Sequence, residues 1–255
     1  MWVRVRFASD ARHHKPLIDE DLARAALERC VLFEHVDVAG LDACLACLRL
    51  RRFRRDETVF HQGDPGDALY VVASGRVKVV LPSPDTGEPA ILATLGPGGF
   101  FGELAMLDGE PHSASVVALE PTEALVLGRD DFERLFEAEP TIRRSLVLAL
   151  ARELRRLTDH VEALHFLDLP SRLAFRIADL ARAAERTGDG GVADERGEVR
   201  LDWPWTQAEL AGMVGGSRES VNRLLADFVA RGLIRFEPDT LVVPDARRLT
   251  QDARR

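Results

Sequence analysis

Residues 206–228 read TQAELAGMVGGSRESVNRLLADF, and two short helical patterns meet there at Gly215-Gly216. The first pattern opens with Thr206 and Glu209, whose spacing can form a capping box at the start of a helix. Ser217 is a suitable N-cap residue for the second pattern. Because two helices joined by a glycine-containing turn are typical of a helix-turn-helix, the stretch predicts that motif.

The second helix of this motif has two chemically different faces. At about 100° per residue, one arc is apolar and the opposite arc is polar, with Val221, Leu224, Leu225 and Phe228 on the first and Arg218, Glu219, Asn222 and Arg223 on the second. Arginine can pair with guanine, glutamate with cytosine and asparagine with adenine, so the polar arc has the groups that read base edges. We therefore expect double-stranded DNA as a partner, with Thr206 and Ser217 at the helix starts as further contacts. A helical hairpin with a solvated charged face is the alternative.

Length and composition indicate a soluble protein of two domains. The chain has 255 residues, 46% of them hydrophobic and 30% charged, which suffices for two separate cores. No apolar run approaches the length of about 18 residues that a membrane helix needs. The start, MWVRVRFASDARHHKP, lacks the long apolar region of a signal peptide and is interpreted as a mobile extension. We expect a cytoplasmic protein with no membrane partner.

The net charge of −8 is distributed unevenly along the chain. Residues 171–255 hold 14 Arg, no Lys and 14 acidic residues, so the whole net charge belongs to residues 1–170. Acidic charge elsewhere in the molecule repels phosphate, whereas a neutral part with clustered Arg can still bind DNA. We expect binding that depends strongly on salt and on sequence-specific contacts, unlike that of a general nucleic-acid coat protein.

The three cysteines, Cys30, Cys44 and Cys47, all lie near the start of the chain. The Cys44-x-x-Cys47 spacing could serve an iron–sulfur sensor. A four-iron cluster needs four thiolates, however, and the pair lies among Leu and Ala at helical spacing. We interpret these two cysteines as small buried hydrophobic residues, with a metal site shared between two subunits as the alternative.

After the cysteines the hydrophobic period changes to two. Short β-rich runs punctuated by glycines predict an antiparallel sandwich or jelly roll, with strands at 58–60, 68–72, 77–81, 90–93, 115–118 and 125–127. Ser74-Gly75 suits a tight hairpin turn. One helical turn at 102–106 interrupts the strands, and the N–H groups at its start could hold a phosphate. Glu103 beside it could accept from sugar hydroxyls, and Ser113 could donate to the same anion.

Residues 141–167 predict one long helix with an apolar seam. Its apolar residues step alternately by three and four, as in a two-stranded coiled coil, namely Val147, Leu150, Leu154, Leu157, Val161 and Leu164. Parallel pairing gives a two-fold homodimer whose recognition helices reach major grooves about 34 Å apart, and packing on its own domain is the alternative. Asp168 then stops this helix and caps the next, at 172–187. Strand-like runs at 233–236 and 240–243 predict a wing, and the Arg-rich tail after residue 245 is expected to be mobile.

Four stretches taken together resemble the CRP/FNR family of bacterial transcription regulators, namely HQGD at 61–64, SGRVKV at 74–79, FFGELAMLDGEPHSA at 100–114 and SRESVNRLLADF at 217–228. The resemblance implies an α+β fold with an N-terminal cyclic-nucleotide-binding-type β-roll, a long dimerisation helix and a C-terminal winged helix-turn-helix. It implies that Arg218, Glu219 and Arg223 read a TGTGA-like half-site, with Asn222 beside them. RNA polymerase is a further partner that it implies.

The resemblance divides the chain into four segments. These are an N-terminal extension at 1–28, a β-roll effector domain at 29–139, a dimerisation helix and hinge at 140–168, and a DNA-binding domain at 169–255. In the family, the hinge is where effector binding reorients the DNA-binding domains, and here it falls at Asp168.

An effector site is also implied by the resemblance, formed by Gly102, Glu103, Leu104, Ala105, His112, Ser113, Leu157 and Thr158. In cyclic-AMP-binding members an Arg clamps the phosphate at the position of His112, and a Thr approaches the adenine at the position of Leu157. Histidine is only partly charged near neutral pH and lacks the guanidinium fork, which costs about 1.5–3 kcal/mol of contact energy. The effector is therefore cyclic AMP, another small ligand or none, and haem held by His61, His112 or His160 is a further alternative.

Two classes of function compete at this point. One is a dimeric DNA-binding regulator, and the other is a cyclic-nucleotide-binding module without DNA function, such as a regulatory subunit. The second class has no use for a recognition helix, so SRESVNR at 217–223 favours the first. The sequence does not support an enzyme, because it holds no nucleophile–base pair and no complete set of metal ligands.

Overall fold

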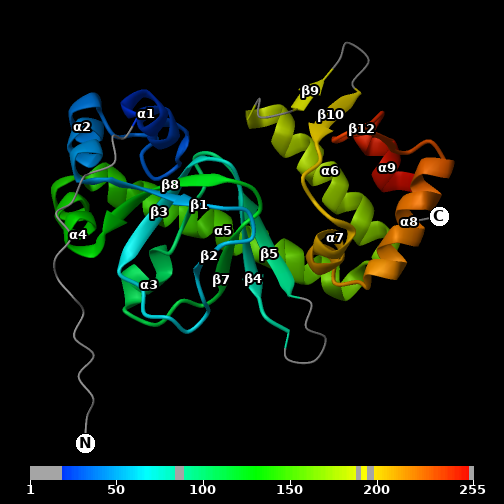
Figure 1. The fold of residues 1–255 in the computed structure, drawn as a ribbon, viewed down its shortest axis with the longest axis horizontal. Coiled ribbons are helices and arrows are strands. Elements are labelled where there is room, and N and C mark those ends of the chain that lie inside the picture. Colours follow the sequence, from blue (N-terminus) through cyan, green and yellow to red (C-terminus); the bar gives the residue numbers. More distant parts are fainter. Residues whose placement is uncertain (1–18, 84–88, 188–190, 194–197, 253–255) are drawn as a thin grey trace, which may run out of the picture.

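The computed structural model describes residues 19–83, 89–187, 191–193 and 198–252, which form two lobes joined by long helices (Figure 1). The first lobe is a β-roll with three helices beside it, α1 (Glu20–Arg29), α2 (Val38–Cys47) and α4 (Arg129–Ala138). The second lobe holds a small sheet and the helices α6 (Leu169–Thr187), α7 (Gln207–Val214), α8 (Arg218–Ala230) and α9 (Ala246–Asp252). The helix α5 (Pro140–Phe166) runs between the lobes.

Two four-stranded antiparallel sheets form the roll. One has the order β1 (Arg49–Phe53), β8 (Thr122–Gly128), β3 (Ala68–Ser74), β6 (Phe100–Phe101). The other has the order β2 (Thr58–Phe60), β7 (Ser115–Ala118), β4 (Val77–Leu81), β5 (Ala90–Leu95). A buried cluster between them includes Tyr70, Val77, Val116 and Ala124, with residues from both sheets. With the long helix and the helix-turn-helix lobe, this roll confirms the predicted fold class.

The turn at Ser74-Gly75 is not the predicted hairpin. Strand β3 pairs with β8 and β6, whereas β4 pairs with β5 and β7, so the turn carries the chain from one sheet to the other. Gly75 has φ +77°, and a Cβ there would lie 2.3 Å from the carbonyl oxygen of Pro121. The glycine is required by this close backbone approach and by its left-handed conformation.

The start of the described chain is folded, so residues 20–28, which the resemblance assigned to an N-terminal extension, are part of the first lobe. Asp19 accepts hydrogen bonds from the N–H groups of Asp21 and Leu22 and so caps α1. Ala23, Ala26 and Leu27 on one face of α1 are at most 2% exposed, because they pack on the outer face of the β1–β8–β3–β6 sheet. Residues 1–18 lie outside the described part.

The structure confirms the expected burial of Cys44 but not that of Cys47. Cys30 and Cys44 are fully buried in the cluster between the helices and the roll, and Cys47 is half-buried. Burial raises the pKa of the Cys30 and Cys44 thiols to about 12. Both are therefore held as neutral thiols, whereas metal ligation requires thiolates.

Helix α5 packs on the first lobe through one face of its first half, and most of its seam residues are exposed. Ile142, Leu146 and Ala149 belong to the core of the first lobe. Of the six seam residues, Leu150 and Leu157 are half-buried, and the exposed fractions of the other four are 65% for Val147, 66% for Leu154, 53% for Val161 and 41% for Leu164. After α5, the Asp168 carboxylate accepts from the Ser171 N–H at 3.0 Å, so it caps α6 as predicted.

The second lobe ends in an ordered helix, so the expectation of a mobile tail is wrong for residues 246–252. Leu249 on α9 is fully buried in the core of that lobe, and Asp245 accepts from the N–H groups of Arg247 and Arg248. The sheet of this lobe has the order β11 (Arg235–Glu237), β12 (Thr240–Val243), β10 (Val199–Asp202), β9 (Gly191–Ala193), and its β11–β12 pair forms the wing. Among the described residues, no helix is both long and apolar enough to cross a membrane.

Candidate functional site

The helix-turn-helix forms as the local sequence requires. Thr206 and Glu209 make the capping box at the start of α7, with the Thr206 N–H donating to the Glu209 carboxylate at 2.8 Å. Gly215 ends α7 in the left-handed conformation, with φ +65°. The Ser217 hydroxyl then accepts from the Ser220 N–H at 3.2 Å and caps α8. Two of the predicted DNA-contacting side chains, Thr206 and Ser217, thus also fix the helix starts.

Helix α8 presents the predicted polar residues on one exposed face. Val221 and Phe228 are fully buried and Leu225 is 5% exposed. The opposite face holds Arg218, Glu219, Asn222 and Arg223, all exposed. Within the described residues neither arginine of this face makes a salt bridge, so both guanidinium groups are available to a ligand. Asn222 is oriented from α7, because its Oδ1 accepts from Gln207 Nε2 at 3.0 Å.

Helix α7 packs directly on the roll. Lys78 Nζ on β4 lies 2.7 Å from Glu209 Oε1, and the side chains of this ion pair are only 13% and 11% exposed. The pair lowers the pKa of Glu209 against the opposing effect of its burial. A Cβ on Gly212 would lie 2.6 Å from the carbonyl oxygen of Pro89, which shows how closely the two backbones approach. Val80 and Ile91 of the roll belong to the same buried cluster as the core of the second lobe.

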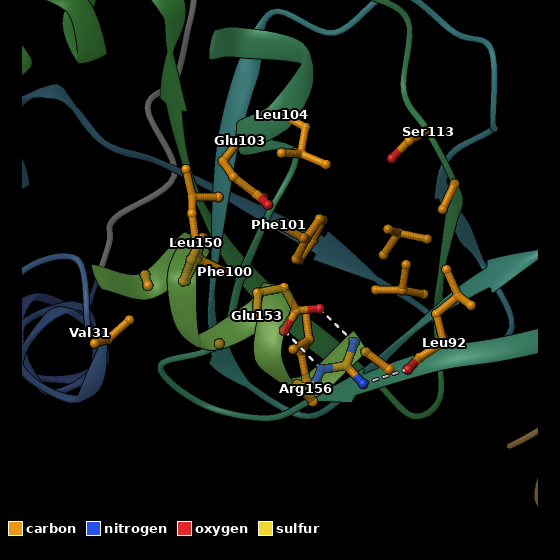
Figure 2. Close-up of a pocket in the computed structure, with 18 of the residues that line it drawn as sticks. Val31, Leu92, Phe100, Phe101, Glu103, Leu104, Ser113, Leu150, Glu153 and Arg156 are labelled. Carbon is orange, nitrogen blue, oxygen red and sulfur yellow. Dashed lines mark hydrogen bonds and ion pairs between the residues drawn. The ribbon is translucent and has the colours of Figure 1, made fainter. Parts of the chain in front are cut away.

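A cavity of about 530 Å³ lies between the roll, α5 and the short helix α3 (Glu103–Asp108) (Figure 2). Seven of the eight predicted effector residues line it, namely Gly102, Glu103, Leu104, Ala105, His112, Ser113 and Leu157. Thr158 is not part of its wall, and its hydroxyl donates to the Leu154 carbonyl oxygen within α5. The FFGELAMLDGEPHSA motif therefore predicted the α3 side of the cavity well.

On the α5 side of the cavity Leu157 was predicted, whereas Glu153 and Arg156 were not. Arg156 donates from Nε and Nη2 to the Glu153 carboxylate at 2.8 and 2.5 Å, and from Nη1 to the Leu92 carbonyl oxygen at 2.9 Å. Figure 2 shows this group across the cavity from Leu104 and Ser113. The spacing of three between Glu153 and Arg156 is the signal in the sequence that could have placed the pair on one face of the helix.

His112 is held as a packed ring. It is 7% exposed and stacks on Phe60 with ring centroids 3.5 Å apart and an interplanar angle of 5°. Its other side is closed by Gly66, where a Cβ would lie 2.7 Å from His112 Cε1. Burial lowers the pKa of His112, and the nearby Asp64 and Asp67 only partly offset this effect. The ring is therefore neutral near pH 7.

Glu103 is the acidic group at the α3 end. Its carboxylate points into the cavity in Figure 2. Burial raises the pKa of this carboxyl from 4.5 to about 7, and Glu153 adds a smaller effect in the same direction. The cavity thus holds a carboxyl whose burial favours the protonated form.

Comparisons with known proteins identify two domains in this chain. A cyclic nucleotide-binding domain model matches residues 50–139, and a Crp-like helix-turn-helix domain model matches residues 171–251. The CRP-like cAMP-activated global transcriptional regulator of Mycobacterium tuberculosis is 37% identical over 93% of this chain and 100% of its own. The cyclic AMP receptor protein of Thermus thermophilus is 35% identical over 87% of this chain and 96% of its own.

A solved structure extends the likeness to three dimensions. The c-di-GMP responsive global regulator CLP of Xanthomonas campestris has a TM-score of 0.68 and 26% identity, covering 81% of this chain and 99% of its own. An antiparallel roll with a ligand-sized cavity and a helix-turn-helix lobe define the class of ligand-responsive DNA-binding regulators. The chain belongs to the CRP/FNR family of transcription regulators.

The raised pKa of Glu103 predicts a pH-dependent stability. Because the folded protein binds this proton more tightly than the unfolded chain, the free energy of unfolding falls as pH rises from 4.5 to about 7, and this contribution is constant above that range. One pKa unit corresponds to about 1.4 kcal/mol, so the loss is at most about 3 kcal/mol.

Glu103→Gln should remove this loss, making the variant more stable than wild type at pH 8 but not at pH 4. Denaturant unfolding at both pH values and at equal protein concentration measures the free energy of unfolding of the two proteins. Glu110→Gln, at an exposed acid just beyond α3, should follow wild type. Equal pH dependence in wild type and Glu103→Gln would contradict the burial of this carboxyl.

Proposed function

We propose that the protein is a homodimeric, sequence-specific DNA-binding transcription regulator, controlled by a small molecule that binds in the cavity beside α3. It reads a TGTGA-like palindromic site, acts in the cytoplasm where that DNA is held, and has RNA polymerase as a further partner. The observation that carries this proposal is the exposed face of α8, where two arginines make no salt bridge to any described residue, opposite a largely buried apolar face.

Four residues of α8 have roles in base reading. Arg218 and Arg223 can each offer a two-pronged guanidinium to guanine O6 and N7, and Glu219 can accept from cytosine N4. Asn222 lies beside them, with its amide oriented by Gln207. The starts of α7 and α8, at Thr206 and Ser217, approach the phosphate backbone, because helix starts present N–H groups to anions.

The seam of α5 is the proposed dimer interface. Its exposed apolar residues form one stripe along the helix, from Val147 through Leu154 and Val161 to Leu164. Such a stripe is stabilised when two copies of the helix pair in parallel. The pairing relates two α8 helices by a two-fold axis, as a palindromic site with half-sites about 34 Å apart requires. The two lobes would then reorient about Asp168, which caps α6.

The effector proposal rests on the cavity and on the relatives. One relative is named as cAMP-activated and another as a cyclic AMP receptor, whereas CLP is named as responsive to c-di-GMP, so ligands differ within this fold. In this chain His112 and Leu157 replace the Arg and Thr that the resemblance associates with cyclic AMP. We therefore propose a small-molecule effector and a weakened affinity for cyclic AMP.

Base reading by α8 is tested with Arg218→Ala and Glu219→Ala. Each change should weaken binding to a TGTGA-containing duplex by about 1–3 kcal/mol and relax the preference at one base pair, because a base-edge contact is lost. Fluorescence anisotropy titrations against single-base variants of the duplex measure both effects. Arg247→Ala removes an exposed charge on α9 and should leave base preference unchanged. A uniform loss on all sequences from the α8 variants would contradict base reading.

Dimerisation is tested with Leu154→Glu or Val161→Glu. A buried charge in the seam should give monomers in multi-angle light scattering, because an unpaired carboxylate cannot be buried between two helices without a large cost. Asp159→Lys, an exposed residue on the opposite side of α5, is the matched control and should remain dimeric. A dimeric Leu154→Glu protein would place the interface elsewhere.

Cyclic AMP binding is tested with His112→Arg. Restoring a guanidinium at this position should tighten the affinity measured by calorimetry by about 10- to 100-fold, since a charge-assisted phosphate contact is worth about 1.5–3 kcal/mol. Ala90→Arg adds the same charge at an exposed position of β5 and should have no such effect. Unchanged binding in His112→Arg would mean that His112 does not occupy the phosphate-binding position.

A further inference from the structure

For the effector site of the regulator proposed above, we infer that the natural ligand is an uncharged, mainly apolar molecule with one hydrogen-bonding group, rather than a phosphate-bearing nucleotide. The inference rests on that proposed function and specifies the chemistry of the same cavity. The cavity has a volume of about 530 Å³, within the range of about 300–1,000 Å³ that small-molecule sites occupy.

The walls of the cavity are mostly apolar. The two sheets and α5 all contribute aromatic or aliphatic side chains, namely Phe60, Val79, Leu92, Leu95, Phe100, Phe101, Val116, Leu150 and Leu157. Burial of apolar ligand surface contributes roughly 25 cal/mol per Å². A ligand that fills this space with carbon therefore gains most of its affinity here without any charged contact.

Among the described residues that line the α3 end of the cavity, none is a cation that could neutralise a phosphate. Its polar groups are the Glu103 carboxyl, the Ser113 hydroxyl and the stacked ring of His112. Helix α3 has only six residues, so its dipole adds little. An anion at this end would also face the partly ionised carboxyl of Glu103, which repels it.

The arginines of the cavity wall are engaged or exposed. The Arg156 guanidinium already donates to Glu153 and to the Leu92 carbonyl oxygen, at the side opposite Ser113 (Figure 2). The side chain of Arg152 is 64% exposed and lies 4.0 Å from Glu34. Arg29 is likewise exposed. A phosphate near these groups would have to displace Glu153 or remain in solvent, which makes either contact weak.

The same polar groups suit a neutral ligand. A protonated Glu103 carboxyl has both a donor and an acceptor, and the Ser113 hydroxyl can serve as either. A ligand hydroxyl, keto or amide group placed between them can pair with both, while the remainder of the ligand lies among the apolar side chains. Two polar groups at one end and an apolar body fix the orientation of the bound molecule.

The test uses the full-length protein and N-phenyl-1-naphthylamine, an uncharged aromatic probe whose fluorescence rises in apolar surroundings. We expect saturable binding to wild type that cyclic AMP at millimolar concentration does not displace. Ala93→Phe fills the cavity from β5 and should weaken probe binding by at least about tenfold. Ala90→Phe places the same ring at an exposed position of that strand and should remain within about twofold of wild type.

A second variant tests the same inference in case Ala93→Phe does not fold. Val79→Thr keeps the size of the side chain and adds a hydroxyl to the apolar wall, so it should weaken the probe several-fold in a protein with wild-type circular dichroism. Displacement of the probe by micromolar cyclic AMP would overturn the inference. Equal probe affinity in wild type, Ala93→Phe and Val79→Thr would overturn it as well.

DNA binding on the same preparations separates the two proposals. Specific binding of the TGTGA-containing duplex, combined with displacement of the probe by cyclic AMP, would refute the ligand class and leave the regulator proposal standing. Absence of specific DNA binding in wild type, with and without the probe, would refute the proposed function, whatever the probe does.

Discussion

The position of the recognition helix depends on a buried contact between α7 and the β4–β5 strands. Glu209 caps α7 through Thr206 and also pairs with Lys78, and both charged side chains are largely withdrawn from solvent. Removing one partner of such a pair leaves an uncompensated buried charge, which costs more than the loss of a surface ion pair. Because α8 is joined to α7 by only three residues, this contact also sets the direction of its polar face.

Strand β5 contacts both the cavity and the helix-turn-helix, so these two sites lie on either side of one strand. Leu92, Ala93 and Leu95 line the cavity, and Ile91 packs in the core shared with α7. Arg156 of α5 donates to the carbonyl oxygen of Leu92, so the long helix contacts the same strand. A ligand that moves β5 therefore acts on α5 and α7 without any intervening element, provided that these contacts have two arrangements that the ligand distinguishes.

Most structural features that depend on a few neighbouring residues were predicted correctly from the sequence. The caps at Thr206 and Ser217 and the apolar, β-branched runs of β3 and β4 are encoded within a few residues, so the helix-turn-helix and most strands were correct. Helices α1 and α9 were missed because their stability comes from packing on distant surfaces. Six of the predicted cavity residues lie in one motif, whereas Phe60, Glu153 and Arg156 are brought to the cavity by the tertiary fold. The Lys78–Glu209 pair spans 131 residues, which no local pattern can indicate.

The effect of a side chain at position 212 of α7 depends on whether the two lobes are packed together. A glycine inside a helix costs about 0.5–1 kcal/mol relative to alanine, so an alanine would favour α7 in a separated second lobe. In the packed arrangement the same methyl carbon would meet the Pro89 carbonyl oxygen at 2.6 Å. An alanine methyl group at position 212 would therefore stabilise the separated second lobe and destabilise the packed arrangement. The glycine at position 212 is less favourable for the helix itself but permits the close contact between the lobes. A substitution there would therefore shift the balance between packed and separated lobes.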